Sequence, residues 1–333
     1  MLRGTVVESR HRVRACIIDR EGRLRAAWGD VDAPMLPRSA TKPLLACVLA
    51  ESGALDKQQL TDRELALACA SHNGEQEHVR AVRSWLENLG LGEADLACGA
   101  HPPFHVPSAA ELISRGETPG ALHNNCSGKH TGFLSAAVSL GLPIKGYMEP
   151  WHPLQMAAAE VLGELTGCAI AGVPEAVDGC GFPQWAISLR GLAAAVARLS
   201  DPEGCGFLGE ARRGALLRIG RAMAAEPFFV AGTDRLCTLL ARETAGRVLG
   251  KTGAEGVYAA WLPGSGLGLA LKAEDGAERG RDVALLSLLR GLDALDETAL
   301  AGESPLARFH SPRLRNWAGR EVGQIRLAPD QGL

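Results

Sequence analysis

Lysine is the residue that this chain most clearly lacks. It supplies only six of the 35 basic residues in the 333-residue sequence, and arginine supplies the rest. A lysine that remains is therefore informative, because its amine can lose a proton near neutral pH and a guanidinium cannot. Three lysines lie in short polar motifs, namely Lys42, Lys129 and Lys251. These three indicate chemistry that needs an amine.

Other scarcities exclude whole classes of function. The formal net charge is -3, and no block of Lys and Arg suggests a basic groove, so no nucleic-acid partner is expected. Aromatic residues make up 5% of the chain, which is too few for platforms that stack on bases. No apolar run approaches the ~18 residues of a membrane-spanning helix, so no membrane partner is expected either.

The nine cysteines are an odd number and are scattered along the chain. Most lie in apolar segments, such as the one around Cys47, where a thiol behaves as a small hydrophobic residue. The first residues contain no apolar core of a signal peptide. We therefore expect a cytoplasmic protein without a disulfide framework.

Strand-like patterns occur at both ends of the chain, with mainly helical patterns between them. The predicted strands are residues 4–8, 12–18, 23–28, 247–251, 256–262 and 267–273. Helical spacing dominates from about 38 to 245 and returns at about 281–295. The predicted fold class is α/β (α+β), with a mostly antiparallel sheet built from about residues 1–30 and 245–275 and flanked by helices. Residues 1–333 are expected to form a single catalytic unit.

Two predicted helices begin with capping boxes, and the chain ends in a polar tail. The boxes are Thr61-Asp62-Arg63-Glu64 and Ser108-Ala109-Ala110-Glu111, each of which opens an apolar run. The tail after residue 311 is rich in Arg and Gly and is expected to be only partly ordered.

The first chemical motif is Ser39-Ala40-Thr41-Lys42, which lies just before an apolar helix. This spacing places Ser39 and Lys42 on one face, where a neutral Lys42 could take the proton of the serine. Pro43 is tolerated only in a first helical turn, so backbone N–H groups would lie nearby to stabilise an oxyanion. Alone the motif is weak, because Ser39 could simply cap the helix.

Two further motifs follow, Ser71-His72-Asn73 and Lys251-Thr252-Gly253. The order S-x-x-K, S-x-N and K-T-G is the set found in penicillin-recognising serine enzymes. In such sites one Ser–Lys pair acts as nucleophile and base, while the other relays protons and holds a carboxylate. Ser71 as a loop residue and Lys251 as surface charge are the alternatives. The close spacing of the first two motifs argues against a β-lactamase itself.

A third group contains two cysteines flanked by polar and flexible residues. Cys126 begins the segment Cys126-Ser127-Gly128-Lys129-His130, and Cys180 lies in Asp178-Gly179-Cys180-Gly181. Cys126, His130 and Cys180 could form a zinc site, although the spacing is not that of a standard finger. Lys129 would be an unusual ligand, because its amine must be deprotonated to bind. A structural role for the thiols remains the alternative.

Taken together, these motifs resemble the rhizobial-type asparaginase II family of L-asparaginases. The matching segments are R-S-A-T-K (38–42), A-S-H-N-G (70–74), N-N-C-S-G-K-H-T-G-F (124–133), V-D-G-C-G-F-P (177–183), G-T-D-R-L-C-T (232–238), G-K-T-G-A-E-G-V (250–257) and N-W-A-G-R-E-V-G (316–323). The resemblance implies a fold related to serine β-lactamases and serine-dependent glutaminases, usually as a homodimer. It also implies hydrolysis of L-asparagine to L-aspartate and ammonia.

The resemblance also implies roles for individual residues. The two Ser–Lys tandems correspond to Ser39–Lys42 and Ser71–Lys251. The zinc ligands correspond to Cys126, Lys129 and Cys180, with an ion that supports substrate binding more than chemistry. The candidate substrate-binding residues are Arg38, Asn73, His130, Asp178 and Cys237.

The hypothesis for the reaction is a double displacement through an aspartyl ester. Ser39, deprotonated by Lys42, attacks the side-chain amide, and Ser71 with Lys251 carries the proton to the leaving ammonia. Arg38 is a candidate partner for the α-carboxylate of the substrate. Asp178 could accept a hydrogen bond from Lys42 or from the substrate's ammonium group.

Several alternatives remain open at this point. Ser71 could be the attacking serine instead of Ser39. The substrate could be L-glutamine or another small amide, because one methylene changes binding by only ~1–3 kcal/mol. The chain could also be a non-catalytic relative that binds an amino acid or a metal, or a hydrolase in which zinc is the catalyst.

Overall fold

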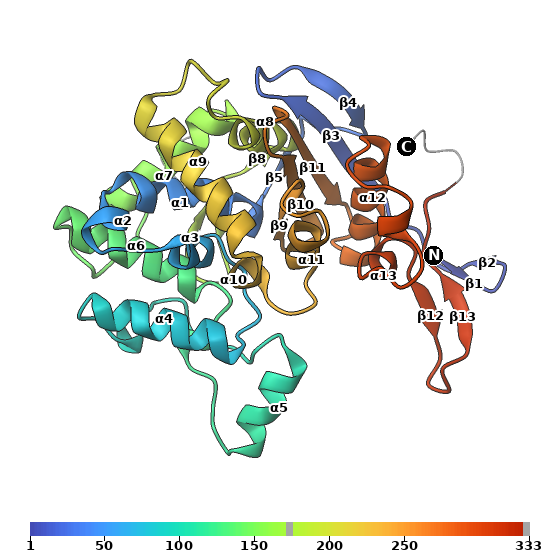
Figure 1. Cartoon of the computed structure of the whole chain (residues 1–333), viewed down its shortest axis with the longest axis horizontal. Helices are drawn as coiled ribbons and strands as arrows, with labels where there is room; N and C mark the ends of the chain where they lie inside the picture. The colour runs from blue at the N-terminus through green and yellow to red at the C-terminus, as the bar shows by residue number, and fades with distance from the viewer. Residues whose placement is uncertain (171–175, 329–333) are drawn as a thin grey trace.

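The central sheet of the molecule is antiparallel and is built from both ends of the chain (Figure 1). The computed structural model describes residues 1–170 and 176–328. In the order of the sheet, the strands are β4 (Leu24–Trp28), β3 (Val13–Asp19), β11 (Leu267–Ala273), β10 (Val257–Leu262) and β9 (Leu249–Gly253). β3 joins the two halves by pairing with β11, where Cys16 lies opposite Ala270. The predicted antiparallel sheet is confirmed, but the predicted strand 4–8 does not join it, because residues 4 and 5 form a turn and only Val6–Val7 of that segment lie in a strand, which belongs to a separate sheet.

The central strands are covered by helices on both sides. α8 (Leu189–Ser200) packs against β3, β10 and β11, and α12 (Glu278–Gly291) packs against the same strands from the other side (Figure 1). Strands buried on both faces have continuous apolar sequences rather than alternating ones. β10, Val-Tyr-Ala-Ala-Trp-Leu, has this pattern, and almost all of it is buried.

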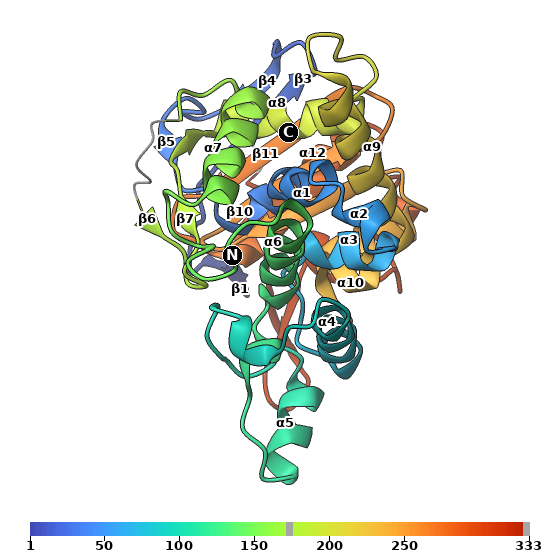
Figure 2. The same cartoon turned by 90° about the vertical axis from the view of Figure 1, so that its left-hand side faces the viewer.

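The middle of the chain is helical, as predicted, and α1 (Lys42–Glu51) lies at its centre (Figure 2). α1 packs against α3, α6, α7 and α9. The remaining helices of the described chain are α1 (Lys42–Glu51), α2 (Ala54–Lys57), α3 (Asp62–Ala68), α4 (Gln76–Asn88), α5 (Val106–Ser114), α6 (Ser127–Leu140), α7 (Pro153–Thr166), α9 (Glu210–Ala225), α10 (Pro227–Ala231), α11 (Leu236–Glu243) and α13 (Ala307–His310). Short 3-10 turns are η1 (Arg38–Thr41), η2 (Glu93–Asp95), η3 (Ala121–His123) and η4 (Thr298–Leu300).

One of the two predicted capping boxes is confirmed and the other is wrong. Thr61 and Glu64 form the reciprocal hydrogen bonds of a capping box at the start of α3. α5 begins instead at Val106, with a proline in its first turn, so Ser108 lies inside the helix. A proline fits the first turn because its fixed φ suits a helix and its missing N–H is not needed there.

The polar tail is more ordered than predicted, because it pairs with the start of the chain. β12 (Arg313–Arg315) and β13 (Glu321–Gln324) form a small sheet with β1 (Leu2–Arg3) and β2 (Val6–Val7), in the order β12-β13-β1-β2. This small sheet projects from the body beside α13 (Figure 1). Residues 329–333 of the predicted tail lie outside the described residues.

Two shorter strand pairs connect the layers. β5 (Pro34–Met35) pairs with β8 (Ile187–Ser188), and β6 (Ala176–Val177) pairs with β7 (Pro183–Gln184). β5 ends two residues before the turn that carries Ser39, and β6 and β7 enclose the segment with Asp178 and Cys180. These pairs therefore fix two segments of the predicted site to the body of the protein.

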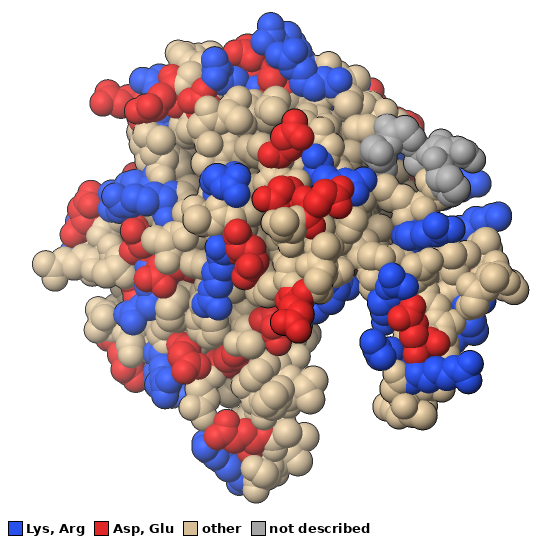
Figure 3. All heavy atoms as spheres, turned by 45° about the vertical axis from the view of Figure 1, so that its right-hand side comes forward, with Lys and Arg blue, Asp and Glu red and all other residues tan. Residues whose placement is uncertain are grey.

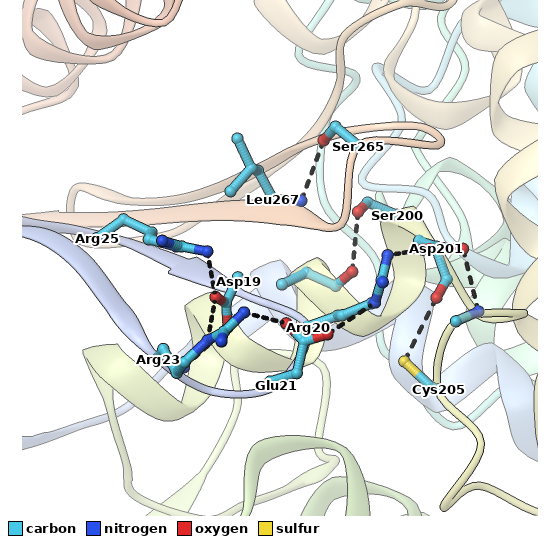
Figure 4. A network of polar contacts seen from close by, with 12 residues as sticks. Asp19, Arg20, Glu21, Arg23, Arg25, Ser200, Asp201, Cys205, Ser265 and Leu267 are labelled. Carbon is cyan, nitrogen blue, oxygen red and sulfur yellow. Dashed lines mark hydrogen bonds and ion pairs between the residues drawn. The ribbon is translucent and has the colours of Figure 1, made fainter.

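A polar network fastens the β3–β4 hairpin to the end of α8 (Figure 4). The Asp19 carboxylate accepts hydrogen bonds or ion pairs from Arg23 at 2.8 Å and from Arg25 at 2.9 Å. Arg20 forms an ion pair with Asp201, which caps the C-terminus of α8. This network holds the sheet against its covering helix at the edge of the molecule. Within the described residues, no helix is both long and apolar enough to cross a membrane.

Candidate active site

Ser39 lies on the 3-10 turn η1, which leads directly into α1. α1 begins at Lys42 with Pro43 in its first turn, as predicted. Because a 3-10 turn has three residues per turn, the side chains of Ser39 and Lys42 leave it on the same side. The preceding residue, Arg38, has a φ of +52°, a left-handed conformation that is unfavourable for a residue with a side chain. Such strain is found mainly at functional sites, and Ser39 is only half-buried here.

The glycine of the Lys-Thr-Gly motif allows η1 to approach strand β9. A Cβ added at Gly253 would lie 2.7 Å from the carbonyl oxygen of Pro37 and 3.2 Å from the nitrogen of Ala40. Only a residue without a side chain fits between the strand and the turn. This close contact brings the first and third motifs together, although more than 200 residues separate them in the sequence.

Ser71 lies where the two buried lysines meet. Its Oγ is 3.0 Å from Nζ of Lys42 and 2.7 Å from Nζ of Lys251, and only 4% of the residue is exposed. The Lys42 amine also donates to the carbonyl of Ala70 and lies 3.1 Å from Sγ of Cys126. The sequence predicted Ser39 as the partner of Lys42. Within the described residues, the Ser39 hydroxyl makes no hydrogen bond, and both amines point to Ser71.

The environment of Lys251 favours the neutral amine. Burial and, after it, the positive charge of Lys42 lower the pKa of Lys251 from 10.5 to about 7. The amine donates to the carbonyl of Thr252 at 3.0 Å, which holds it in place beside Ser71. An amine with this pKa can accept a proton from a hydroxyl near neutral pH.

A second cluster contains the two predicted metal-binding cysteines. One ligand atom each of Cys126, Asp178 and Cys180 lies within 4.8 Å of the others. The hydrogen bond from Cys180 and the charges of Lys42 and Lys129 hold the pKa of Cys126 well below its usual range. The same hydrogen bond raises the pKa of Cys180 to about 11. Of the two thiols, Cys126 therefore favours the thiolate form and Cys180 the protonated form.

Lys129 and His130 complete this cluster. Nζ of Lys129 lies 3.1 Å from Sγ of Cys180 and 3.4 Å from the centre of the Phe182 ring. Nδ1 of His130 is 2.6 Å from the Tyr147 hydroxyl, and burial lowers the pKa of His130 to about 4. Nε2 of this ring is buried and makes no hydrogen bond of ordinary geometry among the described residues, although the ring lies close enough to Cys180 for that thiol to raise its pKa. The sulfur, amine and imidazole groups gathered here are donors that a zinc ion accepts.

Arg38 and Asp178 form an ion pair between the two clusters. Nε of Arg38 donates to Oδ1 of Asp178 at 2.6 Å. Burial alone would raise the pKa of Asp178, but the hydrogen bond from Arg38 and the charge of Lys129 lower it below its usual range. The Asp178 carboxylate is therefore ionised, and the charge of Arg38 is balanced within the protein.

Asn73 and Cys237 lie on the Lys251 side of the site. Nδ2 of Asn73 donates to the carbonyl of Thr233 at 3.0 Å, and its Oδ1 accepts from Arg235 at 2.9 Å. Sγ of Cys237 accepts a hydrogen bond from the Tyr258 hydroxyl at 3.3 Å, and a charge on Cys237 affects the pKa of Lys251. The structure thus brings all twelve predicted site residues to two adjoining clusters, which Lys42 connects through Ser71 and Cys126.

Four residues at this site were missed by the sequence analysis. The chain has only two tyrosines, and both contact predicted site residues: Tyr147 contacts His130 and Tyr258 contacts Cys237. The scarcity of tyrosine could have identified them, as the scarcity of lysine identified Lys42. Arg235 and Arg281 carried no such signal, because arginine is abundant in this chain.

Arg281, on α12, contacts the Lys-Thr-Gly motif through Thr252. It is buried and donates to Oγ1 of Thr252 at 2.8 Å. It also forms an ion pair with Asp282 at 2.7 Å, which balances its charge. Thr252, next to Lys251, is thereby fixed by a side chain from the other side of the sheet.

One family model and several solved structures resemble this chain. A model of the L-asparaginase II family matches residues 1–327. None of the curated proteins matches the chain. Among solved structures, a β-lactamase from Mycobacterium bovis matches with a TM-score of 0.42 and 17% identity, over 85% of this chain and 95% of that one. A β-lactamase-like protein from Bacteroides dorei matches with a TM-score of 0.40 and 13% identity, over 78% and 84% of the two chains.

Proposed function

The chain belongs to the L-asparaginase II family and is an amide hydrolase, and we propose that it cleaves L-asparagine to L-aspartate and ammonia by double displacement on a serine. The observation that carries the mechanism is the convergence of two buried lysines on Ser71. Both amines lie within 3.0 Å of the same hydroxyl oxygen, where two ammonium groups would repel each other. One of the amines is therefore neutral and can accept a proton. A structural role alone would not require this costly arrangement.

Ser39 is proposed as the nucleophile. A substrate carbonyl must reach the attacking oxygen, and Ser39 is half-buried whereas Ser71 is almost fully buried. The Ser71 hydroxyl already contacts both amines, and this suits a group that relays a proton between them. Hydrogen bonds of catalytic groups often tighten only when substrate binds, so the present separation of Ser39 from the Lys42 amine is compatible with catalysis.

The proton route proposed for acylation runs along the contacts of the two lysines. Ser39 attacks the amide carbon and gives its proton to Lys42, which passes a proton through Ser71 to the neutral amine of Lys251. The leaving nitrogen takes a proton from this chain of groups and departs as ammonia. Water then attacks the aspartyl ester, and the same groups return the proton to Ser39.

Zinc is proposed to bind at Cys126, Lys129 and Cys180. The donor set fits, because Cys126 already favours the thiolate, Cys180 lies within 4.8 Å, and the orphaned imidazole nitrogen of His130 lies in the same cluster. Lys129 would have to release its proton to bind, and Asp178 is a geometrically available further ligand. A zinc ion held there would act as a Lewis acid toward an oxygen or nitrogen of the substrate.

A homodimer in the cytoplasm is also proposed. α5 has no buried residue, and its apolar side chains Val106 and Ile113 are 76% and 77% exposed. Trp317 at the tip of the small sheet is fully exposed. A deep notch separates the arm that carries α5 from this sheet (Figure 3), and a second copy could cover both. All nine cysteines are free, as a reducing compartment requires.

Ammonia release from L-asparagine and from L-glutamine tests the proposed function. We expect turnover of asparagine by the wild type and a loss of at least about 100-fold in Lys42→Arg, because a guanidinium cannot accept a proton. Retained activity of this variant would contradict a proton-transfer role of Lys42. A preference for glutamine would identify the related amidohydrolase. Removal of zinc by a chelator should raise KM with little change in kcat, whereas loss of kcat at saturating asparagine would identify a zinc hydrolase.

A further inference from the structure

Arg235 is a cation beside the Ser71–Lys251 pair that has no acidic partner. It is half-buried and precedes α11, and its Nη1 donates to Oδ1 of Asn73 at 2.9 Å. Within residues 1–170 and 176–328, no Asp or Glu forms an ion pair with it. The other guanidinium groups of the site are different, because Arg38 is paired with Asp178 and Arg281 with Asp282.

Several contacts place Arg235 at the reacting groups. Asn73, which holds it, is buried and lies two residues after Ser71. The charge of Arg235 also lowers the pKa of Lys251, so the guanidinium lies close enough to act on that amine. Asn73 itself is fixed from the other side, because its Nδ2 donates to Thr233 and to Glu75. Arg235 is thus held through Nη1, and its guanidinium makes no other hydrogen bond to the part of the chain that the structure describes.

The carboxylates around Arg235 are engaged with other groups. Asp282, whose pKa the charge of Arg235 lowers, is paired with Arg281. Glu75 accepts hydrogen bonds from the backbone and the hydroxyl of Thr233, both at 2.7 Å. Asp234, the neighbouring residue in the sequence, forms an ion pair with Arg308 at 2.9 Å. A partly desolvated guanidinium without a counter-ion favours an anionic ligand with a planar pair of oxygens.

We propose that Arg235 is the anchor for the α-carboxylate of the amino-acid substrate. This inference rests on the proposed function and changes one part of it, because the sequence analysis gave that role to Arg38. Since Arg38 is already balanced by Asp178, the pair presents an ionised carboxylate that suits the substrate's ammonium group. The carboxylate of the amino acid is then bound by Arg235 and its ammonium group by Asp178, with the side-chain amide toward the serines.

Three amides that differ by one charged group separate these roles. Asparagine carries both charges, 3-aminopropanamide lacks the carboxylate, and succinamate lacks the ammonium group. We expect Arg235→Gln to lower kcat/KM for asparagine on the order of 100-fold, mainly through KM, since a hydrogen bond to a charged group is lost. The variant should leave kcat/KM for 3-aminopropanamide largely unchanged. Both rates are measured at about pH 7.5, where the amino groups of the substrates are mostly charged, and a rise in the pKa of Lys251 on removal of the nearby guanidinium affects both substrates alike.

Arg38→Gln is the matched control, because it removes a guanidinium from the same site. It should preserve the preference for asparagine over 3-aminopropanamide. If this preference is lost in Arg38→Gln and retained in Arg235→Gln, the anchor is Arg38 and the proposal is wrong. An equal loss on both substrates in Arg235→Gln would likewise overturn it, since Arg235 would then act only by positioning Asn73.

Equilibrium binding of L-aspartate, measured by calorimetry, tests the anchor without turnover. The wild type and Arg38→Gln should bind the product, Arg235→Gln should lose most of the affinity, and Arg235→Lys should recover part of it. Undiminished binding by Arg235→Gln would refute the proposal. If the wild type released no ammonia from any of the three amides, the proposed function would fail. Loss of aspartate binding in Arg235→Gln, with binding kept in the wild type, would still support the anchor.

Discussion

The rate of asparagine hydrolysis is expected to rise with pH through a limb near pH 7, because Lys251 must be neutral to accept a proton. Burial and the charge of Lys42 lower its pKa from 10.5 to about 7. With that pKa, about 76% of the amine is neutral at about pH 7.5 and about 9% at about pH 6. kcat/KM should therefore fall about eightfold between these two values. An unperturbed lysine would be only about 0.1% neutral at about pH 7.5, and its limb would lie far higher.

The assay is ammonia release under kcat/KM conditions across about pH 5.5 to 9.5, at constant ionic strength. Lys251→Arg should lose about 100- to 10,000-fold in activity, and the limb should disappear with it. Arg235→Gln should move the limb upward, because the charge of Arg235 contributes to lowering the pKa of Lys251. Arg38→Gln, whose guanidinium is paired with Asp178, should leave the limb in place.

A profile that stays flat from about pH 5.5 to 8 would refute the reasoning, because it would mean that no group with a pKa near 7 transfers the proton. A limb that persists unchanged in Lys251→Arg would also contradict it, because the titrating group would then be another residue. Folding of each variant is checked by its urea unfolding midpoint, so that a lost limb is not confused with a lost fold.

Three further predictions concern the serines, Gly253 and the stability of the buried amine. A diazoketone analogue of asparagine should label Ser39 in the wild type and in Ser71→Ala, and mass spectrometry should find no label in Ser39→Ala; a label on Ser71 would make Ser71 the nucleophile. Gly253→Ala should lower activity more than about tenfold and cost ~1–3 kcal/mol in unfolding free energy, because its Cβ would meet the Pro37 carbonyl at 2.7 Å. Gly220→Ala, where nothing lies within 4 Å, should leave the activity unchanged and, because Gly220 lies inside α9, should stabilise the fold by about 0.5–1 kcal/mol. Lys251→Met should be inactive but more stable than the wild type near pH 7; because only the unfolded amine binds a proton between about pH 7 and 10.5, this advantage should shrink as the pH rises through that range in urea titrations.

The parts of the fold that the sequence predicted are those set by local patterns. β10 and α1 are continuous apolar runs that can be recognised without knowing their neighbours. The pairing of β13 with β1 could not be predicted, because it joins the two ends of the chain and its strands are short and polar. The start of α5 was wrong because two helix-starting signals compete there, and the proline in the first turn prevailed over the serine two positions into the helix.

The candidate site was found by residue type, whereas its connections came only from the structure. The scarcity of lysine selected Lys42 and Lys251, but a four-carbon side chain can reach in several directions. Lys42 therefore reaches Ser71 across the site rather than Ser39 on its own turn. Arg235 could not be selected from the sequence, because its distinguishing property is the lack of an acidic partner, and this property depends on tertiary structure.

Arginine and lysine have different partners in this structure, and this difference connects the lysines of the motifs with Arg235. Within the described residues, every ion pair between a basic side chain and a carboxylate is made by arginine or histidine, and none is made by lysine. The three lysines in the motifs instead contact hydroxyl, carbonyl and sulfur atoms, which leave the amine free to release its proton. Arginine that stabilises the fold is paired with an acid, so an unpaired Arg235 at the same site has a charge left for a ligand. The lysines that transfer the proton and the arginine that we expect to bind the substrate therefore share one property, which is that none of them is paired with a carboxylate of the described chain.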